Sequence, residues 1–415
     1  MTYPDSVRFL YALGNELKTA EFALERITRL AEAMGHPHLR PHLFIHVAGT
    51  NGKGSTCAMI ESGLRAAGLR TGLFTSPHLL EPTERIRIDG IPVSIEEFTR
   101  AFDLIHALAE RLIDAGEIDQ HPSYFETVLA MALLLFREKE VDVTVLEVGL
   151  GGRLDATNIV EPELSVITPI DFDHERFLGT TIESIASEKA GIIKPGIPVV
   201  MSPQRPEAEA IIRSHTINII PAWTADQIDL HRDGSRIATH GMLLDCNLRG
   251  RHQVINALTA AAALDAFHIA PEAIGQGIAA ARWPGRLDRI SDSPEVIVDG
   301  AHNPAGARAL AAYVAEFYAH PKPVLIFGAM RDKAVEEMAA TLFPHFRQVI
   351  VTAPAQQRAL TPETFLSIAD HPSITTAPNF TEALASVAPA DATIFLSGSL
   401  FLVGEALEHF RNAAY

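Results

Sequence analysis

The chain has 415 residues, of which 47% are hydrophobic and 20% charged, a composition typical of a globular protein with two domains and large cores. Its formal net charge is −17, from 34 Lys and Arg against 51 Asp and Glu, which argues against general binding to nucleic acid or to a membrane surface. An anionic substrate must therefore be held by local positive groups rather than by the field of the whole molecule.

Several features predict a cytoplasmic protein. The N-terminus shows no basic segment followed by an apolar stretch, so we expect no signal peptide. The longest apolar run, residues 128–136, is too short to span a bilayer and predicts a buried helix. The two cysteines, Cys57 and Cys246, do not make a disulfide framework, and Cys57 is expected to pack within a helix.

Strand and helix patterns alternate along most of the chain. Strand-like runs lie at residues 43–47, 71–75, 143–148, 164–168 and 198–201, and helix-like runs at 95–115, 124–138 and 182–193. This alternation predicts an α/β fold with a mostly parallel sheet and helices on both faces. Charged and apolar residues alternate around 228–248, which indicates a β-rich insertion, and a helical segment is expected at 252–267.

The sequence Trp283-Pro284-Gly285-Arg286 interrupts this rhythm, which then restarts. Strands are expected at 296–298, 324–327, 348–352 and 393–397, and helices at 305–317, 334–342 and 400–410. We therefore predict a P-loop-type domain at 1–284 and a smaller, Rossmann-like α/β domain at 285–415, with the reactive site in the cleft between them. The turn at 299–304 is not a dinucleotide-binding fingerprint.

The most informative motif is Gly49-Thr50-Asn51-Gly52-Lys53-Gly54-Ser55, between a strand-like run and a helix-like run. In such a turn the backbone N–H groups, the positive end of the helix and the lysine bind the phosphates of a nucleoside triphosphate. The match to G-x-x-x-x-G-K-[ST] is imperfect, because Gly54 is an extra residue and the spacing back to Gly49 is one short. An ordinary glycine-rich turn is the alternative, but it has no use for a lysine between two glycines.

Transfer of a γ-phosphoryl group needs Mg²⁺, which binds hard oxygen ligands. Glu147 ends an apolar strand and is the best candidate ligand, with a turn acid as the alternative. Asp173-His174 follows the next strand and could add a ligand, because the carboxyl ends of parallel strands form the functional edge of a sheet. Four histidines resemble a metal cluster by number only and are interpreted as structural: His36, His38, His42 and His46.

For several other residues, the residue and its local sequence do not by themselves decide between a functional and a structural role. Lys189 lies on a helical segment and is interpreted as a solvated lysine. Arg286 and Asp299 flank the expected domain junction, where an arginine could clamp a phosphate or form an interdomain salt bridge. The glycine-rich segment 149–158 suits a loop that lies against a ligand.

Together these segments closely resemble the folylpolyglutamate synthase/dihydrofolate synthase family of the Mur-ligase superfamily. The matching segments are residues 46–55, 75–79, 84–86, 124–126, 147–158, 173–174, 177–179, 188–194, 283–286, 299–304 and 397–400. They occur in family order, and the joint pattern is highly specific although no single segment is.

The resemblance implies an ATP-dependent carboxylate–amine ligase of folate biosynthesis and one-carbon metabolism. ATP would convert a carboxylate to an acyl phosphate, and the α-amine of L-glutamate would attack it to give an amide, ADP and phosphate. The expected acceptors are dihydropteroate and tetrahydrofolate (poly)glutamates, used by a bifunctional enzyme that is a monomer without nucleic-acid or membrane partners. The alternatives are a monofunctional folylpolyglutamate synthase and a Mur-type ligase with another acceptor.

The resemblance also implies site residues. The ATP contacts are Thr50, Asn51, Gly52, Lys53, Gly54, Ser55, Asn256, Arg286 and Asp299. The Mg²⁺ ligands are Ser76, Glu147 and His174, and the pterin-binding residues are Ser123, Tyr124, Phe125, Glu126, Leu154, Asp155 and Ala156. Catalytic roles are implied for Lys53, Lys189 and His302. Lys189 matches a family lysine that is carbamylated, and His302 and Ser397 would position glutamate or phosphate.

Two positions depart from the family pattern. Residues 21–26 read Glu-Phe-Ala-Leu-Glu-Arg where the family often has leucine-glycine-glutamate, so the pterin contacts of this loop are open. Ser123 stands where threonine is common and keeps the hydroxyl group.

Two functions of other kinds fit the sequence less well. A Mur ligase acting on a nucleotide-linked peptide would need a nucleotide-sugar-binding domain, and the 48 residues before Gly49 are too few for one. An ATP-operated switch that ligates nothing would lack acceptor and amine sites, and the expected second domain with His302 and Arg286 argues against it.

Overall fold

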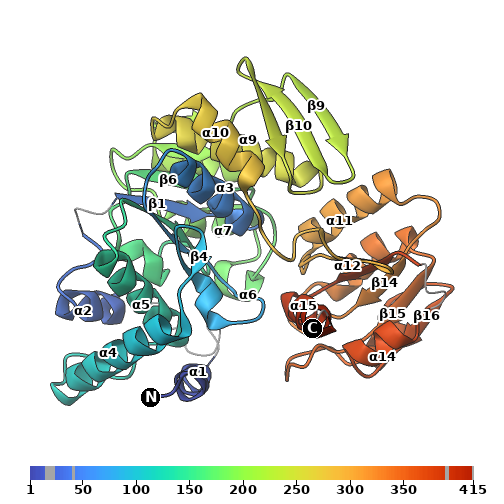
Figure 1. Cartoon of the computed structure of the whole chain (residues 1–415), viewed down its shortest axis with the longest axis horizontal. Helices are drawn as coiled ribbons and strands as arrows, with labels where there is room; N and C mark the ends of the chain where they lie inside the picture. Colours follow the sequence, from blue (N-terminus) through green and yellow to red (C-terminus); the bar gives the residue numbers. More distant parts are fainter. Residues whose placement is uncertain (15–23, 40–42, 388–391, 414–415) are drawn as a thin grey trace. The chain divides into compact units, whose positions relative to one another are not determined.

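The computed structural model describes residues 1–14, 24–39, 43–387 and 392–413 (Figure 1). They form two compact units. The first consists of residues Met1–Ala225, Thr239–Leu244 and Ile255–Ala281, and the second of Asp226–Ala238, Asp245–Val254 and Arg282–Tyr415. The domain boundary after residue 284 stays a prediction.

A mostly parallel sheet forms the centre of the first unit. In the described residues its strands are β4 (Ile91–Pro92), β3 (Ile86–Ile88), β2 (Thr71–Phe74), β5 (Val143–Glu147), β1 (Leu43–Ala48), β6 (Leu164–Ile167), β7 (Val199–Met201) and β8 (Ile219–Pro221), in this spatial order. The strands from β2 to β8 pair in parallel, and β3 and β4 add an antiparallel edge. The predicted parallel sheet is confirmed.

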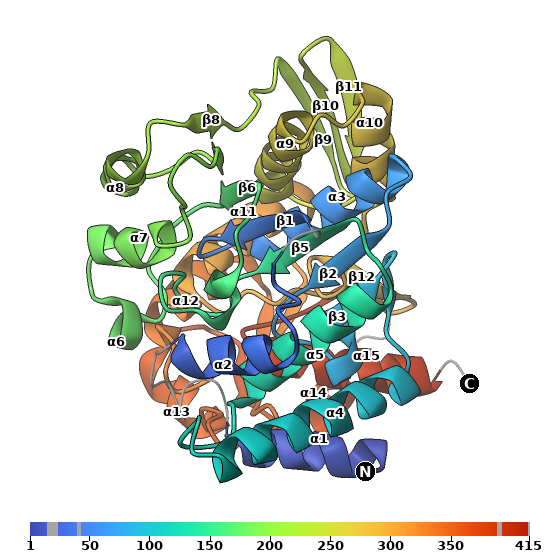
Figure 2. The same cartoon turned by 90° about the vertical axis from the view of Figure 1, so that its left-hand side faces the viewer.

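Helices cover both faces of this sheet, as Figure 2 shows. Helix α3 (Lys53–Ala66) packs on β5, β2 and β1, and α10 (Pro271–Ala280) packs on α3. On the other face lie α5 (Tyr124–Glu138) and α4 (Ile95–Asp114). The remaining helices are α1 (Tyr3–Ala12), α2 (Glu25–Ala33), α6 (Glu175–Leu178), α7 (Ile182–Ala190), α8 (Pro206–His215), α9 (Arg251–Ala266), and the 3₁₀ helices η1 (Pro82–Arg85) and η2 (Ala156–Ile159).

The second unit repeats the α/β arrangement around a smaller sheet. Its described strands are β12 (Asp288–Asp292), β13 (Glu295–Val298), β17 (Ile394–Ser397), β14 (Val324–Phe327), β15 (Gln348–Val351) and β16 (Ile374–Thr376), in spatial order. All pair in parallel except β12. Its helices are α11 (Pro304–Phe317), α12 (Val335–Leu342), η3 (Phe343–His345), α13 (Pro362–Ile368), α14 (Phe380–Ala385) and α15 (Leu400–Ala413).

The predicted β-rich insertion is confirmed as a three-stranded sheet of β9 (Gln227–His231), β10 (Gly234–Thr239) and β11 (Met242–Cys246). The apolar run 128–136 is buried within α5, and Cys57 is buried within α3, as expected. The helix expected at 182–193 ends earlier, at Ala190. In the part of the chain that the structure describes, no helix is long and apolar enough to cross a membrane.

Two glycines let α3 and α10 approach each other closely. A Cβ on Gly277 would lie 2.3 Å from the Cα of Gly63, whereas a Cβ on Gly275 in the same helix would meet nothing nearer than a Leu244 methyl at 4.0 Å. The contact between the helices therefore depends on the missing side chain at one position and not at the other.

Gly277→Ala should destabilise the protein by about 1–3 kcal/mol, the usual cost of an overpacked core. Gly275→Ala is the matched control and should be neutral or slightly stabilising, because alanine favours the helix more than glycine does. Urea unfolding followed by circular dichroism measures both. Equal midpoints for the two variants would show that α3 and α10 can move apart freely.

Candidate nucleotide and folate site

The turn between β1 and α3 requires glycine at two positions. Gly49 and Gly52 have φ angles of +149° and +86°. A Cβ on Gly49 would lie 1.9 Å from the Thr168 Oγ1, and a Cβ on Gly52 would lie 2.3 Å from the Asn256 Oδ1. Thr168 and Asn256 therefore leave no room for a side chain at positions 49 and 52 of this turn.

Hydrogen bonds attach the turn to the segment after β6. The backbone N–H groups of Thr50 and Asn51 donate to the Pro169 carbonyl at 3.0 and 3.3 Å. The Thr50 hydroxyl donates to the Asp171 carbonyl at 2.9 Å and accepts from the Asp171 N–H at 3.1 Å. The family resemblance implies nucleotide contacts for Thr50 and Asn51, and the structure shows that they also fix the shape of the turn.

Two lysine amines converge on this turn. Lys53, at the first position of α3, donates to the carbonyls of Gly49 and Thr50 at 3.1 and 3.3 Å. The Lys189 Nζ donates to the same Gly49 carbonyl at 2.9 Å. Concentrated positive charge at a helix N-terminus suits a triphosphate.

The interpretation of Lys189 as a solvated lysine is wrong. Only 5% of the residue is exposed. Burial, helped by the nearby Lys53 charge, lowers the pKa of the Lys189 amine to about 7. The local sequence around Lys189 could not predict this burial, because its amine contacts the β1–α3 turn, which is distant in the sequence.

The predicted metal ligands follow three parallel strands of the sheet. Glu147 ends β5, where it is 4% exposed and stands in register with Val47 of β1. Its Oε2 accepts a hydrogen bond of 3.1 Å from the N–H of Ser76, which follows β2. His174 follows β6 and begins α6, and its N–H donates to the Asp173 carboxylate at 2.8 Å. The structure thus joins Ser76 to Glu147 directly.

These residues lie at a topological switch point. The connection from β1 runs toward β2 on one side, and the connection from β5 runs toward β6 on the other, although β1 and β5 are neighbours. Ligands of open α/β sheets bind at the carboxyl edge of such a point. The Glu147 carboxylate and the Ser76 hydroxyl provide the hard oxygen atoms that Mg²⁺ prefers, whereas the His174 imidazole is a softer donor, so two of the three predicted ligands fit this ion.

Two residues of the predicted pterin set also make structural hydrogen bonds. Ser123 and Glu126 form a capping box at the start of α5. The Glu126 carboxylate also accepts from the Arg26 Nε at 3.1 and 3.2 Å. Residues 21–23 of the departing family motif lie outside the described residues.

The two aromatic residues of the predicted pterin set, Tyr124 and Phe125, have different neighbours. The Tyr124 ring stacks on Tyr11 with centroids 5.7 Å apart, and the Arg85 guanidinium lies 4.7 Å from the Tyr124 centroid. Phe125 packs edge-on against Phe74 at 5.5 Å.

The loop at 149–158 is organised by one carboxylate. Asp155 Oδ2 accepts from the N–H groups of Gly149 and Leu150 at 3.0 and 2.9 Å, and Oδ1 accepts from the Thr157 N–H at 2.9 Å. Leu154 is half-buried and Ala156 is buried at the start of η2. The structure therefore gives Asp155 a loop-shaping role besides any contact with a substrate.

The predicted residues of the second unit gather at the β13–α11 turn. The Asp299 carboxylate accepts from the N–H groups of Leu287 and Ala301 at 2.9 and 3.0 Å. Arg286 lies beside Gly300, and His302 Nδ1 donates to the Gly300 carbonyl at 2.7 Å. Ser397 ends β17, and its hydroxyl donates to the Ala301 carbonyl at 3.4 Å.

Of the four histidines interpreted as structural, His46 has the contacts of a structural residue. His46 is fully buried, shares a hydrogen bond of 2.8 Å with the Thr157 hydroxyl, and has its pKa lowered to about 3 by burial. The rings of His36 and His38 lie 5.9 Å apart. His42 lies outside the described residues.

A pair formed by the buried Arg85 and the half-buried His78 has no counterpart among the predicted site residues. Arg85 Nε donates to His78 Nδ1 at 2.9 Å, and burial together with this arginine lowers the pKa of His78 to about 3. Tyr11 contacts His78 through its hydroxyl at 3.0 Å. His78 and Arg85 lie in the family-like segments 75–79 and 84–86, but their spacing in the sequence does not predict that they contact each other.

Comparison with known proteins agrees with this geometry. A family model of the Mur ligase middle domain matches residues 47–264, and one of the Mur ligase glutamate ligase domain matches residues 285–400. The chain therefore contains two domains of the Mur ligase class, the middle domain and the glutamate ligase domain.

Individual relatives show which family within the Mur ligases this chain resembles. Folylpolyglutamate synthase of Lacticaseibacillus casei is 36% identical over 379 residues, covering 87% of each chain. Dihydrofolate synthase/folylpolyglutamate synthase of Bacillus subtilis is 40% identical over 343 residues, covering 77% of this chain and 78% of the relative. Folylpolyglutamate synthase of Mycobacterium tuberculosis, solved with ADP, is 33% identical with a TM-score of 0.91, covering 98% of this chain and 99% of that one. The chain belongs to the folylpolyglutamate synthase/dihydrofolate synthase family.

The pKa of Lys189 makes stability depend on pH. Its folded pKa of about 7 lies below the ordinary 10.5. Between these values the unfolded chain keeps a proton that the folded chain has released, so this group makes the protein more stable as pH rises. Below about pH 7 both states carry the proton, and the folded state bears the full cost of a buried charge.

Lys189→Met should therefore be more stable than the parent at about pH 6, with an advantage that shrinks as pH rises toward 10. Urea unfolding of the nucleotide-free proteins across this range measures the difference. An advantage that stays constant with pH would mean that Lys189 remains charged when folded.

Proposed function

We propose that this protein is an ATP-dependent ligase that adds L-glutamate to dihydropteroate and to tetrahydrofolate (poly)glutamates. The observation that carries the proposal is the glycine–lysine turn beside the buried Glu147 at the switch point of the sheet. Relatives support the choice of acceptor, since one folylpolyglutamate synthase structure is a complex with AMPPCP and folate, and Escherichia coli FolC was solved with DHPP and ADP.

In this mechanism the acceptor carboxylate attacks the γ-phosphorus of ATP, the bond from that phosphorus to ADP breaks, and an acyl phosphate is formed while ADP leaves. The turn N–H groups, the α3 N-terminus and Lys53 would hold the phosphates. Mg²⁺, held by Ser76, Glu147 and His174, would neutralise phosphate charge. The glutamate α-amine then attacks the acyl carbon, inorganic phosphate leaves, and the amine loses a proton. His302 and Ser397 are proposed to position glutamate or phosphate.

Carbamylation of Lys189 is a finer part of the proposal. At a pKa of about 7 much of the amine is neutral and can attack CO₂, forming a nitrogen–carbon bond and releasing a proton. The carbamate would bring two oxygens that share one negative charge to a turn where the Lys189 amine now lies against the Gly49 carbonyl. We also propose a cytoplasmic monomer with domains 1–284 and 285–415.

The direct test mixes the protein with ATP, Mg²⁺ and L-glutamate and measures ADP release with dihydropteroate or a tetrahydrofolate as acceptor. We expect glutamate-dependent release with both acceptors. Release with the folate alone would select the monofunctional alternative. ADP release that ignores both glutamate and acceptor would contradict ligase activity.

Glu147→Gln should lower kcat by at least about 10²-fold, the scale of removing one preorganised electrostatic group. Glu61→Gln is the matched control, because Glu61 is also 4% exposed but bonds to Thr71 in the body of the first unit. The control should lose stability and keep its turnover. Similar turnover of Glu147→Gln and the parent would remove Glu147 from the site.

Lys189→Ala should lower turnover by a similar factor of about 10², and formate or acetate should restore part of it by replacing the carbamate oxygens. The same anions added to Glu147→Gln provide the control for a general salt effect. Full activity of Lys189→Ala without added carboxylate would refute both the carbamate and a catalytic role for Lys189.

A further inference from the structure

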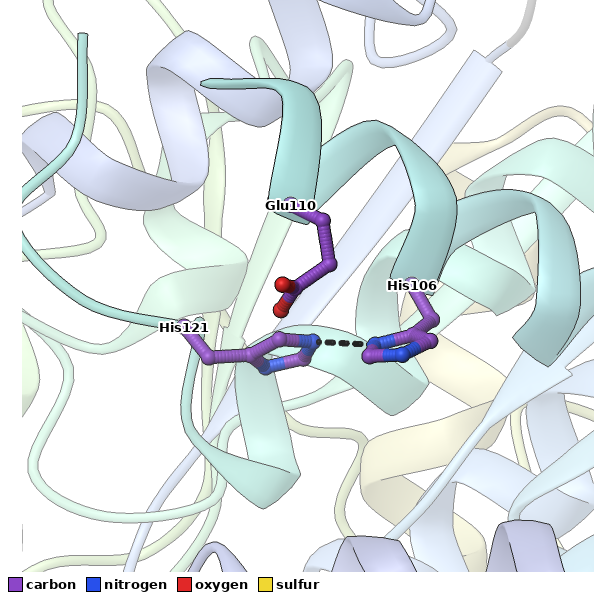
Figure 3. Close-up of side chains that lie close together, drawn as sticks. All are labelled: His106, Glu110 and His121. Atoms are coloured by element: carbon purple, nitrogen blue, oxygen red, sulfur yellow. Dashed lines mark hydrogen bonds between the residues drawn. The ribbon is translucent and has the colours of Figure 1, made fainter. Parts of the chain in front are cut away.

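A second cluster of side chains that could bind a metal lies away from the nucleotide turn, on the C-terminal half of α4 and the segment after it. It consists of His106 and Glu110 on α4 and His121 on the segment that follows. One ligand atom from each lies within 4.8 Å of the others. Figure 3 shows the three side chains gathered, with the His106 and His121 rings linked by a hydrogen bond.

Local structure places each of these groups. His106 and Glu110 are one helical turn apart and so project from the same side of α4, which a capping box at Ser94 stabilises at its start. His121 Nδ1 lies 2.9 Å from the Pro122 carbonyl, and because a carbonyl only accepts, this nitrogen carries the proton. The lone pair of His121 Nε2 then points at His106 Nδ1, 3.1 Å away.

This is the arrangement expected around a histidine that binds a metal. Metal-binding histidines generally donate their other ring N–H to a carbonyl or carboxylate, which fixes the tautomer and the ring. Phe9 adds an apolar wall, with its centroid 4.6 Å from the His106 ring and 5.2 Å from the His121 ring. The Phe102 ring also stacks on His106, with centroids 5.6 Å apart.

Burial favours the neutral form of the His121 imidazole, which is the form that binds a metal. Burial is the main cause that lowers the pKa of His121, with His106 and Arg26 acting in the same direction. The Pro122 carbonyl and the Glu110 carboxylate act in the opposite direction. The Glu110 carboxylate supplies a negative charge beside the two imidazoles.

We propose that His106 Nδ1, His121 Nε2 and the Glu110 carboxylate bind one divalent cation of the Zn²⁺ class, with water as the fourth ligand. Two imidazoles and one carboxylate are a common zinc donor set and disfavour Mg²⁺. On binding, His106 moves its proton from Nδ1 to Nε2, so each ring stays neutral.

The cation would tie the end of α4 to the segment that leads into α5. His121 precedes Ser123, the N-cap of α5, by two residues. Arg26 links this segment further, through Glu126 at 3.1 Å and Asp119 at 3.9 Å. Occupancy should therefore stabilise the start of α5, independently of any ligase activity.

The test uses the full chain after removal of metals with a chelator. Zn²⁺ affinity is measured by competition with a chromophoric chelator, and Co²⁺ serves as an optical probe of coordination. We expect one tight site with the visible spectrum of tetrahedral Co²⁺. His121→Ala and Glu110→Gln should each weaken Zn²⁺ binding by at least about 10-fold, since even outer partners of metal ligands contribute about 10- to 100-fold.

Two control variants show whether Zn²⁺ binds at this cluster or elsewhere on the chain. His268→Ala removes an exposed histidine elsewhere in the first unit and should leave the affinity unchanged. Glu147→Gln disables the proposed Mg²⁺ site and should also leave it unchanged, so failure of the ligase proposal would not affect the result.

Glu110 is exposed, so Glu110→Gln tests the cluster without a threat to folding. Unaltered Zn²⁺ affinity and Co²⁺ spectrum in Glu110→Gln and His121→Ala, or no binding by the parent, would overturn the proposal.

Discussion

The carbonyl oxygen of Gly49 accepts hydrogen bonds from two lysine amines. This shared acceptor connects the turn to two helices of the first unit. Lys53 reaches it from α3, and Lys189 reaches it from α7, 140 residues along the chain from Gly49. A chain with a net charge of −17 does not attract an anion by its overall field. It instead places lysine amines on a turn whose positions 49 and 52 have room only for glycine.

The same crowding connects distant parts of the first unit. Thr168 after β6 and Asn256 of α9 lie where side chains on Gly49 and Gly52 would stand. Glu147 stands one strand away, bonded to Ser76. A shift of any of these segments would change the turn, so its shape depends on the surrounding strands and helices as much as on its own spacing. The strand–turn–helix geometry of a P-loop is therefore kept although the spacing of its glycines differs from the usual one.

Periodicity and turn chemistry were sufficient to predict the main strands, the long helices and the P-loop turn. Long buried strands such as β1 read as apolar runs, and helices such as α5 begin with a capping box. Short or polar elements were missed: β12 is a polar edge strand, and α13 and α14 have only seven and six residues. Tertiary contacts could not be predicted from the sequence, as the burial of Lys189 and the Arg85–His78 pair show. The sequence motif located the site, but the multiple structural roles of Glu126 and Asp155 appeared only in three dimensions.

The central claim is that the Gly49–Gly52 turn and Glu147 together bind ATP with Mg²⁺. A crystal structure of the protein with a non-hydrolysable ATP analogue and Mg²⁺ tests it most directly. It should show the phosphates on the turn N–H groups, the Lys53 amine beside the terminal phosphate, and the ion beside Glu147. Nucleotide bound elsewhere, with the turn in its present form and Glu147 remote from the ion, would contradict the claim.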